Sequence, residues 1–116
     1  MTFSSLKGQI ILLVFGFGNC PFCVKEIPVL NQLHDEYRDK PFKVVYINIT
    51  EGEAQVKNFV KKRGIKYMTL VDKKGSSANA FGVIGVPANF LIDKDQLKIE
   101  EVDVHDNIRD KINQLL

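Results

Sequence analysis

The chain has no tryptophan, only two cysteines and only two histidines among its 116 residues. It also has little excess charge, because 16 basic and 14 acidic side chains leave a formal net charge of +2. A protein that binds nucleic acid by charge carries a larger basic excess. The longest run of apolar residues and glycine covers residues 10–18, about half of the ~20 residues that a membrane-spanning helix needs. We therefore expect neither nucleic-acid binding nor a membrane span.

Linkers and repeats are absent as well. The sequence contains no internal repeat, no low-complexity stretch and no Gly/Ser/Pro-rich segment. Its length is close to the ~100–200 residues of one domain, and a chain of this size buries a core without disulfide staples. We expect residues 1–116 to form a single domain and a monomer. No basic segment followed by an apolar stretch marks a signal peptide, which leaves a cytoplasmic location open.

Hydrophobic spacing predicts alternating strands and helices. Strands are expected at residues 9–17, 42–49, 67–72, 87–93 and 96–104. Helices are expected at residues 20–37, 51–63, 76–81 and 107–115. Strands that alternate with helices form parallel crossovers, and the last two strands form an antiparallel hairpin. The prediction is an α/β fold with a mixed central β-sheet and helices on both faces.

The two cysteines lie together in the motif Cys20-Pro21-Phe22-Cys23. A disulfide across so short a loop gives little entropic stabilisation, so we interpret the pair as chemically active. The motif follows a buried strand and begins a helix, whose N-terminus lowers the pKa of a thiol placed there. Cys20 is therefore the candidate attacking thiolate, and Cys23 is the candidate resolving thiol. Pro21 restricts the loop, and Phe22 brings no charge to it.

Other interpretations of the cysteine pair stay open. One is a buried, unreactive pair. Another is a carrier that binds copper or zinc through the same two thiols. Zinc usually takes four ligands, and the two histidines, His34 and His105, form no second ligand cluster. We interpret His34 as a helix-face residue and His105 as a loop or cap residue, so no metal site is assigned.

These motifs resemble the thioredoxin superfamily, and within it the thiol–disulfide oxidoreductases of the TlpA/ResA type. The resemblance runs from Ser5 through essentially the whole chain. It rests on Leu6-Lys7-Gly8, the strand at 10–17, Cys20 to Cys23 with Lys25-Glu26-Ile27-Pro28, the helix at 51–63, Gly85-Val86-Pro87 and Phe90-Leu91-Ile92-Asp93. It implies a thioredoxin-like fold and a protein-disulfide oxidoreductase that needs no cofactor and takes part in cell redox homeostasis.

The resemblance also implies partners and a location. The expected partners are cysteine-containing protein substrates and an upstream thiol reductase. The pair would act as a reductant, for example of cysteines in cytochrome c precursors, and the location would be extracytoplasmic or periplasmic. A peroxidase on the same fold would need a threonine and an arginine beside the cysteine. Neither Arg38 nor Arg63 stands in an evident constellation with Cys20.

Four further residues gain a role from the resemblance. Pro87 is the expected cis-proline facing the cysteines, and Val86 would offer its backbone to an extended substrate segment. Pro21 and Phe22 would complete the substrate-binding surface. All four would then contact the partner protein, and none would carry out a covalent step.

Glu26 is the candidate acid of the site. It lies three residues after Cys23, where the ResA-like branch has an acid, whereas cytosolic thioredoxin carries a buried acid at the position of Val14. Partly buried near the thiols, Glu26 would carry the proton of Cys23 and couple the two titrations. The alternative is a solvated helix residue with a small electrostatic contribution.

The chain departs from the family pattern at several positions. Gly16 and Asn19 stand where the family has tryptophans, and Asn19 is a candidate N-cap of the following helix. Ala88 and Asn89 replace the more usual pair of threonines after the proline. The N-terminal hairpin typical of the branch is missing, so we expect a trimmed domain or a minimal member. These differences affect partner specificity and leave the thiol chemistry intact.

Overall fold

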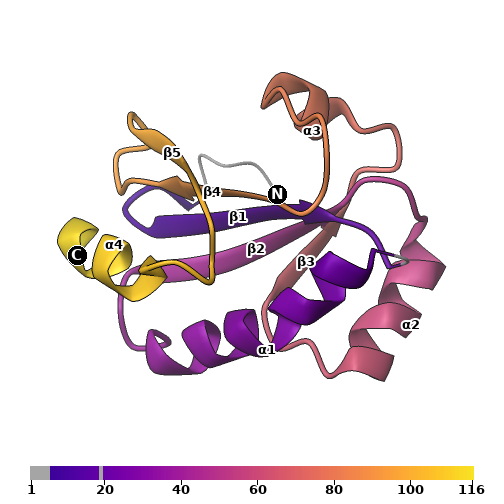
Figure 1. The fold of residues 1–116 in the computed structure, drawn as a ribbon, viewed down its shortest axis with the longest axis horizontal. Coiled ribbons are helices and arrows are strands. Elements are labelled where there is room, and N and C mark those ends of the chain that lie inside the picture. The colour runs from indigo at the N-terminus through magenta and orange to yellow at the C-terminus, as the bar shows by residue number, and fades with distance from the viewer. Residues whose placement is uncertain (1–5, 19) are drawn as a thin grey trace.

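The computed structural model describes residues 6–18 and 20–116, in which strands and helices alternate (Figure 1). The strands are β1 (Ile10–Gly16), β2 (Phe42–Asn48), β3 (Met68–Val71), β4 (Ala88–Ile92) and β5 (Ile99–Val102). The helices are α1 (Pro21–Glu36), α2 (Glu53–Arg63), α3 (Ser76–Ala80) and α4 (Ile108–Leu115). Each element lies within the range predicted from the sequence. No helix in the described residues is both long and apolar enough to cross a membrane.

The described strands form a mixed sheet in the order β3-β2-β1-β4-β5. β1 pairs in parallel with β2, and β2 pairs in parallel with β3. β4 runs antiparallel to both β1 and β5. β1 therefore lies in the middle of the sheet, and its whole length is buried, as its unbroken apolar sequence predicts. The carboxyl end of this central strand leads toward the cysteines.

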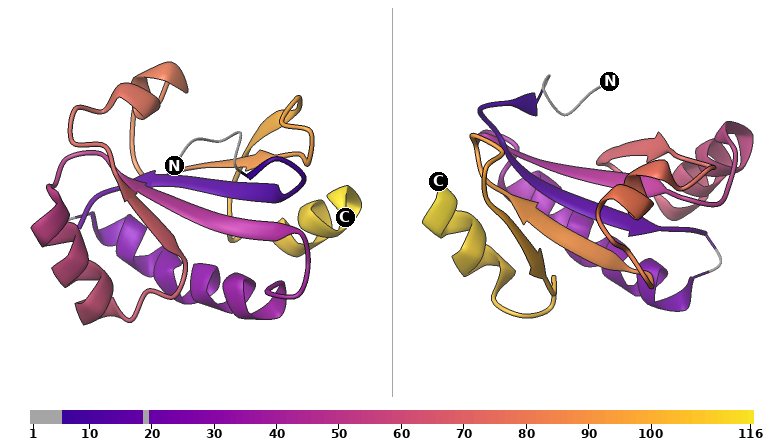
Figure 2. Two further views of the ribbon diagram at one scale, coloured as in Figure 1. Left: turned by 180° about the vertical axis from the view of Figure 1, so that it is seen from behind. Right: turned by 90° about the horizontal axis from the view of Figure 1, so that it is seen from above.

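Helices cover both faces of the sheet (Figure 2). α1, α2 and α4 pack on the face to which Leu12, Val14 and Tyr46 contribute. α3 covers the opposite face, where Ala78 packs in a cluster with Leu13. β1 contributes side chains to both cores because successive side chains of a strand point to opposite faces. The predicted α/β fold, with a mixed sheet between layers of helices, is therefore confirmed.

α1 turns one face to the sheet and carries the second cysteine on that face. Its buried residues are Cys23, Glu26, Ile27, Leu30 and Leu33. Their three- and four-residue spacing places them on one stripe of the helix. Glu26 is only 5% exposed, so it is not the solvated residue of the alternative interpretation. The helix thus brings a carboxyl group and a cysteine to the same buried face.

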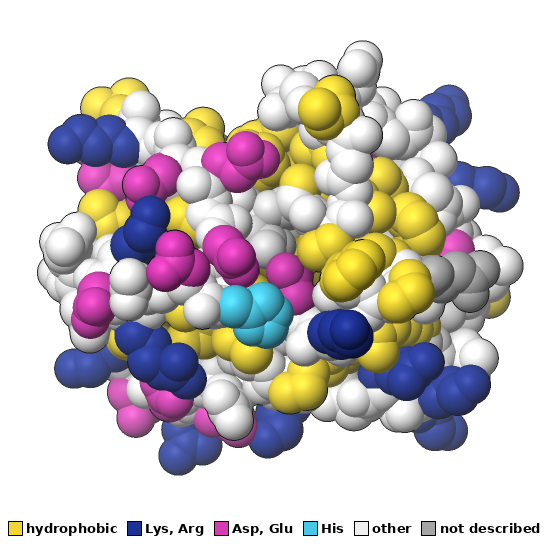
Figure 3. Space-filling view, in the orientation of Figure 1, with side chains coloured by type: hydrophobic (Ala, Val, Ile, Leu, Met, Phe, Trp, Pro, Cys, Tyr) yellow, Lys and Arg dark blue, Asp and Glu magenta, His cyan; other side chains and the backbone are white. Residues whose placement is uncertain are grey.

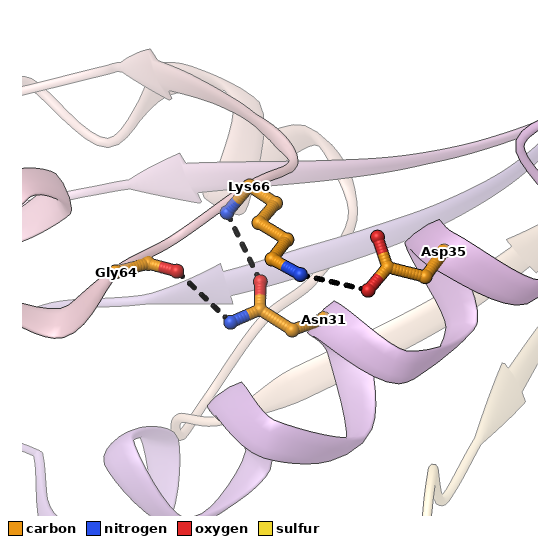
Figure 4. Close-up of polar contacts among 4 residues, drawn as sticks. All are labelled: Asn31, Asp35, Gly64 and Lys66. Atoms are coloured by element: carbon orange, nitrogen blue, oxygen red, sulfur yellow. Dashed lines mark hydrogen bonds and ion pairs between the residues drawn. The ribbon is translucent and has the colours of Figure 1, made fainter.

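α1 is tied to the connection between α2 and β3 (Figure 4). Asn31 Nδ2 donates a 3.0 Å hydrogen bond to the Gly64 carbonyl, and Asn31 Oδ1 accepts one of 3.0 Å from the Lys66 N–H. Lys66 Nζ lies 2.8 Å from a carboxylate oxygen of Asp35. Gly64 ends α2 in the left-handed conformation, which glycine adopts without strain. These contacts help to fix α1, and with it the cysteines at its start.

Candidate functional site

The cysteine pair lies where β1 leads into α1, and Cys20 is disulfide-bonded to Cys23. Cys20 occupies the N-cap of α1 in an extended conformation, and Pro21 follows in the first turn. The Cys23 N–H donates a 3.2 Å hydrogen bond to Cys20 Sγ. A free N–H at a helix start is a ready partner for an anionic group, so this geometry suits a Cys20 thiolate. The predicted N-cap residue, Asn19, lies outside the described residues.

The peptide bond between Val86 and Pro87 is cis, as predicted. The carbonyl oxygen of Val86 lies 3.9 Å from Cys20 Sγ, so this loop faces the cysteines. Phe22 is 66% exposed beside them, and Lys25 Nζ lies 5.3 Å from the centre of its ring. Hydrophobic side chains gather on this side of the molecule between α3 and the start of α1 (Figure 3). The cysteines therefore lie beside an apolar surface and the backbone carbonyl of Val86.

Glu26 and Asn89 form a buried polar pair beneath the site. Asn89 Nδ2 donates a 3.0 Å hydrogen bond to Glu26 Oε2, and the two residues are 5% and 4% exposed. The other oxygen of each, Glu26 Oε1 and Asn89 Oδ1, has no hydrogen-bond partner among the described residues. Burial raises the pKa of Glu26, while the hydrogen bond from Asn89 partly offsets that rise. This carboxyl group therefore binds a proton more readily than an ordinary glutamate does.

In the sequence, Asn89 stands out only as a departure from the family pattern. In the sheet it stands opposite Val14, the position at which thioredoxin carries its buried acid. Its side chain reaches Glu26 across 63 positions of the chain. A polar residue inside an apolar strand was the available signal, because a buried polar side chain needs a partner.

A pocket opens beside this polar pair. It is lined by Phe22, Lys25, Glu26, Pro87, Asn89, Val102, Asp103 and His105. The charge of His105 lowers the pKa of Glu26, and that of Asp103 raises it, both more weakly than burial does. Figure 3 shows acidic side chains around a histidine on this face. The sequence interpretation of His105 as a loop residue missed its place in the pocket wall.

The segment before Cys20 is held by a carboxylate. Glu51 Oε1 accepts hydrogen bonds from the Gly18 N–H at 2.6 Å and from Asn48 Nδ2 at 2.8 Å. Asn48 Oδ1 in turn accepts from the backbone N–H groups of Thr50 and Glu51. A Cβ at Gly18 would lie 2.9 Å from a Glu51 carboxylate oxygen, so the glycine permits this close approach. The sequence places Glu51 only at the start of the helix expected at 51–63, whereas α2 begins at Glu53.

Metal ligands do not gather around the pair. Across residues 6–18 and 20–116, no three side chains of His, Cys, Asp or Glu form a group that could hold an ion.

Comparison with known proteins identifies the family. The Redoxin family model matches residues 1–116. The thiol-disulfide oxidoreductase ResA of Bacillus thuringiensis subsp. konkukian (strain 97-27) is 38% identical over 96 residues. That match covers 83% of this chain and 56% of the relative, so the chain spans little more than half the length of that protein.

Solved structures share the fold over nearly all of the chain. The thioredoxin domain of a thiol-disulfide oxidoreductase from Bacteroides vulgatus has a TM-score of 0.86 at 20% identity, covering 98% of this chain and 84% of that one. A secreted disulfide oxidoreductase of Mycobacterium tuberculosis has a TM-score of 0.82 at 22% identity, covering 99% and 88%. The chain belongs to the Redoxin family, as a TlpA/ResA-like member of the thioredoxin superfamily.

Proposed function

We propose that this chain is a protein thiol–disulfide oxidoreductase that exchanges its Cys20–Cys23 pair with the cysteines of partner proteins. The observation that carries the proposal is the position of Cys20. It caps α1, accepts the Cys23 N–H, is bonded to Cys23 and faces the cis peptide bond before Pro87. A thiolate at a helix start, with a second thiol one turn away, is the arrangement that disulfide exchange needs.

The exchange proceeds in two displacements. The Cys20 thiolate attacks one sulfur of the partner disulfide, which forms a mixed disulfide and releases the first partner thiolate. The Cys23 thiolate then attacks Cys20 Sγ, which forms the intramolecular disulfide and releases the second partner thiolate. Two electrons pass from the cysteine pair to the partner, and the same steps reversed oxidise a partner dithiol. Cys23 is the more buried of the two, in keeping with its role as the resolving thiol.

The surroundings of Cys20 supply the binding surface for the partner. In this proposal the Val86 carbonyl accepts a hydrogen bond from an extended segment of the partner, and Pro87 keeps that segment beside the sulfur. Phe22 and Pro21 contact its apolar side chains, which is supported by the exposure of both residues. These contacts place the partner sulfur within reach of Cys20 Sγ.

Glu26 takes the proton of Cys23 in the second displacement. Burial raises the pKa of Glu26, and the side chain lies on the same buried face of α1 as Cys23. A base with a raised pKa holds the proton more readily than an ordinary carboxylate does. Asn89 holds one oxygen of Glu26, so the other is the oxygen that can accept the proton.

The family resemblance further supports a direction, partners and a location. We infer that the pair works as a reductant of cysteine-containing proteins outside the cytoplasm and is itself reduced by an upstream thiol reductase. The whole of residues 1–116 would act as a single, monomeric domain without a cofactor.

Substitution of each cysteine tests the proposed function. Cys20→Ser should abolish the reduction of a protein disulfide such as that of insulin, because it removes the attacking sulfur. Cys23→Ser should leave the first displacement intact and accumulate a mixed disulfide through Cys20, which non-reducing electrophoresis and mass spectrometry detect. A Cys23→Ser variant that turns over at the wild-type rate would refute the two-step exchange.

The metal-carrier alternative predicts a different result. Protein purified in the reduced state would then hold copper or zinc in a one-to-one ratio at neutral pH, and both cysteine variants would lose it. Stoichiometric metal together with no disulfide exchange would contradict the proposed function.

A further inference from the structure

Tyr46 carries a buried hydroxyl group that has no role in the proposed exchange. Its side chain is 1% exposed, in the core between the sheet and α1. Its hydroxyl oxygen has no hydrogen-bond partner among the described residues. Buried hydroxyl groups without a partner are rare, because losing the hydrogen bonds of water carries a large free-energy cost. The position of this hydroxyl therefore calls for an explanation.

The surroundings of Gly16 place the Tyr46 hydroxyl group close to Cys23. A Cβ placed on Gly16 would lie 2.5 Å from the Tyr46 hydroxyl oxygen and 2.9 Å from Cys23 Sγ. The oxygen and the sulfur both lie close to the position of this Cβ. The distance between the two atoms is therefore at most the sum of these two distances. No side chain stands on Gly16 to separate them. In the oxidised protein no hydrogen bond joins Tyr46 to Cys23, whose sulfur is bonded to Cys20.

The strand register explains how Tyr46 reaches the end of β1. Tyr46 pairs with Val14 in β1, and Gly16 lies two residues further along on the same face of the sheet. A tyrosine ring is long enough to extend from the Val14 level over the Gly16 Cα. Gly16 stands where the family has a tryptophan, so no large side chain of β1 fills the space beside the cysteine here. The ring of Tyr46 reaches this space from the neighbouring strand.

The ionisation of Tyr46 determines what it can do. Burial raises its pKa, and the carboxylates of Glu51 and Glu26 raise it further. The hydroxyl group therefore keeps its proton across the physiological range. It can donate a hydrogen bond, but it does not transfer its proton.

We propose that, once the disulfide is reduced, the Tyr46 hydroxyl donates a hydrogen bond to the sulfur of Cys23 and stabilises its thiolate. This inference rests on the proposed disulfide exchange and adds Tyr46 to its catalytic residues. Reduction breaks the bond between the sulfurs and frees Cys23 Sγ to turn toward the hydroxyl group. The thiolate is the form that attacks the mixed disulfide, so the hydrogen bond raises the fraction of Cys23 ready to react.

Other charged groups act on Cys23 in the opposite direction. Glu26 lies on its own helix, and Glu51 follows β2 and holds the segment before Cys20. Both carboxylates disfavour a second negative charge nearby. Asp103 and His105, which follow β5, act through Glu26 with opposite signs. The Tyr46 hydroxyl group and the N-terminus of α1 act in favour of the thiolate.

Tyr46→Phe tests the proposal because it removes the hydroxyl oxygen and keeps the ring that packs against Phe59 and Tyr67. The ¹³Cβ chemical shift of Cys23 in the reduced protein, followed against pH, reports the pKa of this thiol separately from that of Cys20. The pKa should rise by about one unit, a tenfold loss of thiolate at a given pH below it, because hydrogen bonds to charged groups are the stronger ones. Tyr67→Phe is the matched control, since it removes another buried, unpartnered hydroxyl group and should leave this pKa unchanged.

A second measurement needs no variant. The ¹³Cζ shift of Tyr46 should change when the wild-type protein is reduced, whereas that of Tyr67 should not. An unchanged Cys23 pKa in Tyr46→Phe, or no response of Tyr46 to reduction, would overturn the inference. Insulin reduction by the wild type is measured in parallel. A wild type that exchanges disulfides while Tyr46→Phe leaves the pKa unchanged refutes only the role of Tyr46, whereas an inactive wild type refutes the proposed function.

Discussion

Among the single residues of the site, Glu26 and Asn89 share one buried hydrogen bond, and each keeps an oxygen without a partner in the described residues. Ordinary packing does not account for two such acceptors side by side, because a buried acceptor without a donor destabilises the fold. Both residues line the same pocket as Pro87. In the proposed exchange, the proton of the resolving thiol, or a donor group of the bound partner, reaches these oxygens.

The pH dependence of the protein's stability should reflect the titration of Glu26. Its pKa is raised in the folded protein, mainly by burial. A carboxyl group of this kind favours folding below its unfolded pKa, and that contribution is lost as the pH rises through its folded pKa. Glu26→Gln abolishes this titration. The melting temperature of the variant, measured relative to that of the wild type, should therefore rise from acid to neutral pH. Parallel melting curves across that range would contradict the raised pKa.

The reactivity of Cys23 should also depend on Glu26. Glu26→Gln should alter the pH dependence of Cys23 alkylation in the reduced protein, because an amide cannot take up the thiol proton. Glu53→Gln, at the exposed first turn of α2, removes a carboxylate away from the cysteines and should leave the profile unchanged. Identical profiles for Glu26→Gln and the wild type would remove Glu26 from the proton path.

At the scale of elements, the end of β1 is the tightest point of the site. A Cβ at Gly16 would meet both the Tyr46 hydroxyl oxygen and Cys23 Sγ. Gly16→Ala should therefore lower the free energy of unfolding by about 1–3 kcal/mol, the usual cost of overpacking. Urea denaturation measures the loss. Gly85→Ala is the control, because a Cβ there meets no atom within 4 Å and should cost much less.

Removal of the Tyr46 oxygen should relieve part of the overpacking that Gly16→Ala introduces. In a double-mutant cycle, Gly16→Ala should cost less in a Tyr46→Phe background than in the wild type, because one of the two close contacts is gone. The same urea denaturation series measures the difference. Strictly additive costs would show that Tyr46 is not the neighbour that limits space at Gly16.

The link between α1 and the α2–β3 connection offers a second test at this scale. Asn31→Ala removes two hydrogen bonds to the backbone and should cost about 1–2 kcal/mol of unfolding free energy. Asp35→Ala removes only an ion pair between side chains that are 48% and 55% exposed, so it should cost less than Asn31→Ala does. An equal loss in both variants would contradict this ranking, because the ion pair would then contribute as much as the two hydrogen bonds of Asn31.

The elements themselves were predictable from the sequence, whereas the contacts between their side chains were not. Apolar runs and three-to-four spacing located each strand and helix, and the cysteine spacing located the start of α1. The bond from Asn89 to Glu26 spans 63 positions, and that from Gly18 to Glu51 spans 33. Local periodicity carries no information about which distant polar residues meet. Tyr46 was hidden for the same reason, since its sequence position indicates only a buried strand.

At the scale of the whole molecule, the sheet brings the parts of the site together. β1 ends beside β4, so the loop carrying Pro87 faces the start of α1, and helices on both faces bury the central strand. The geometry around Cys20 thus follows from the order of the strands.

In the proposed function, Cys20 and Cys23 form a reversible redox pair that exchanges with other thiols. A redox titration of residues 1–116 against glutathione, with trapped thiols counted by mass spectrometry, tests it most directly. Both cysteines should convert together in one reversible two-electron transition, and a reductant should have a midpoint potential below that of the glutathione couple. A pair that reacts only after the protein unfolds, or shows no reversible transition, would contradict the claim.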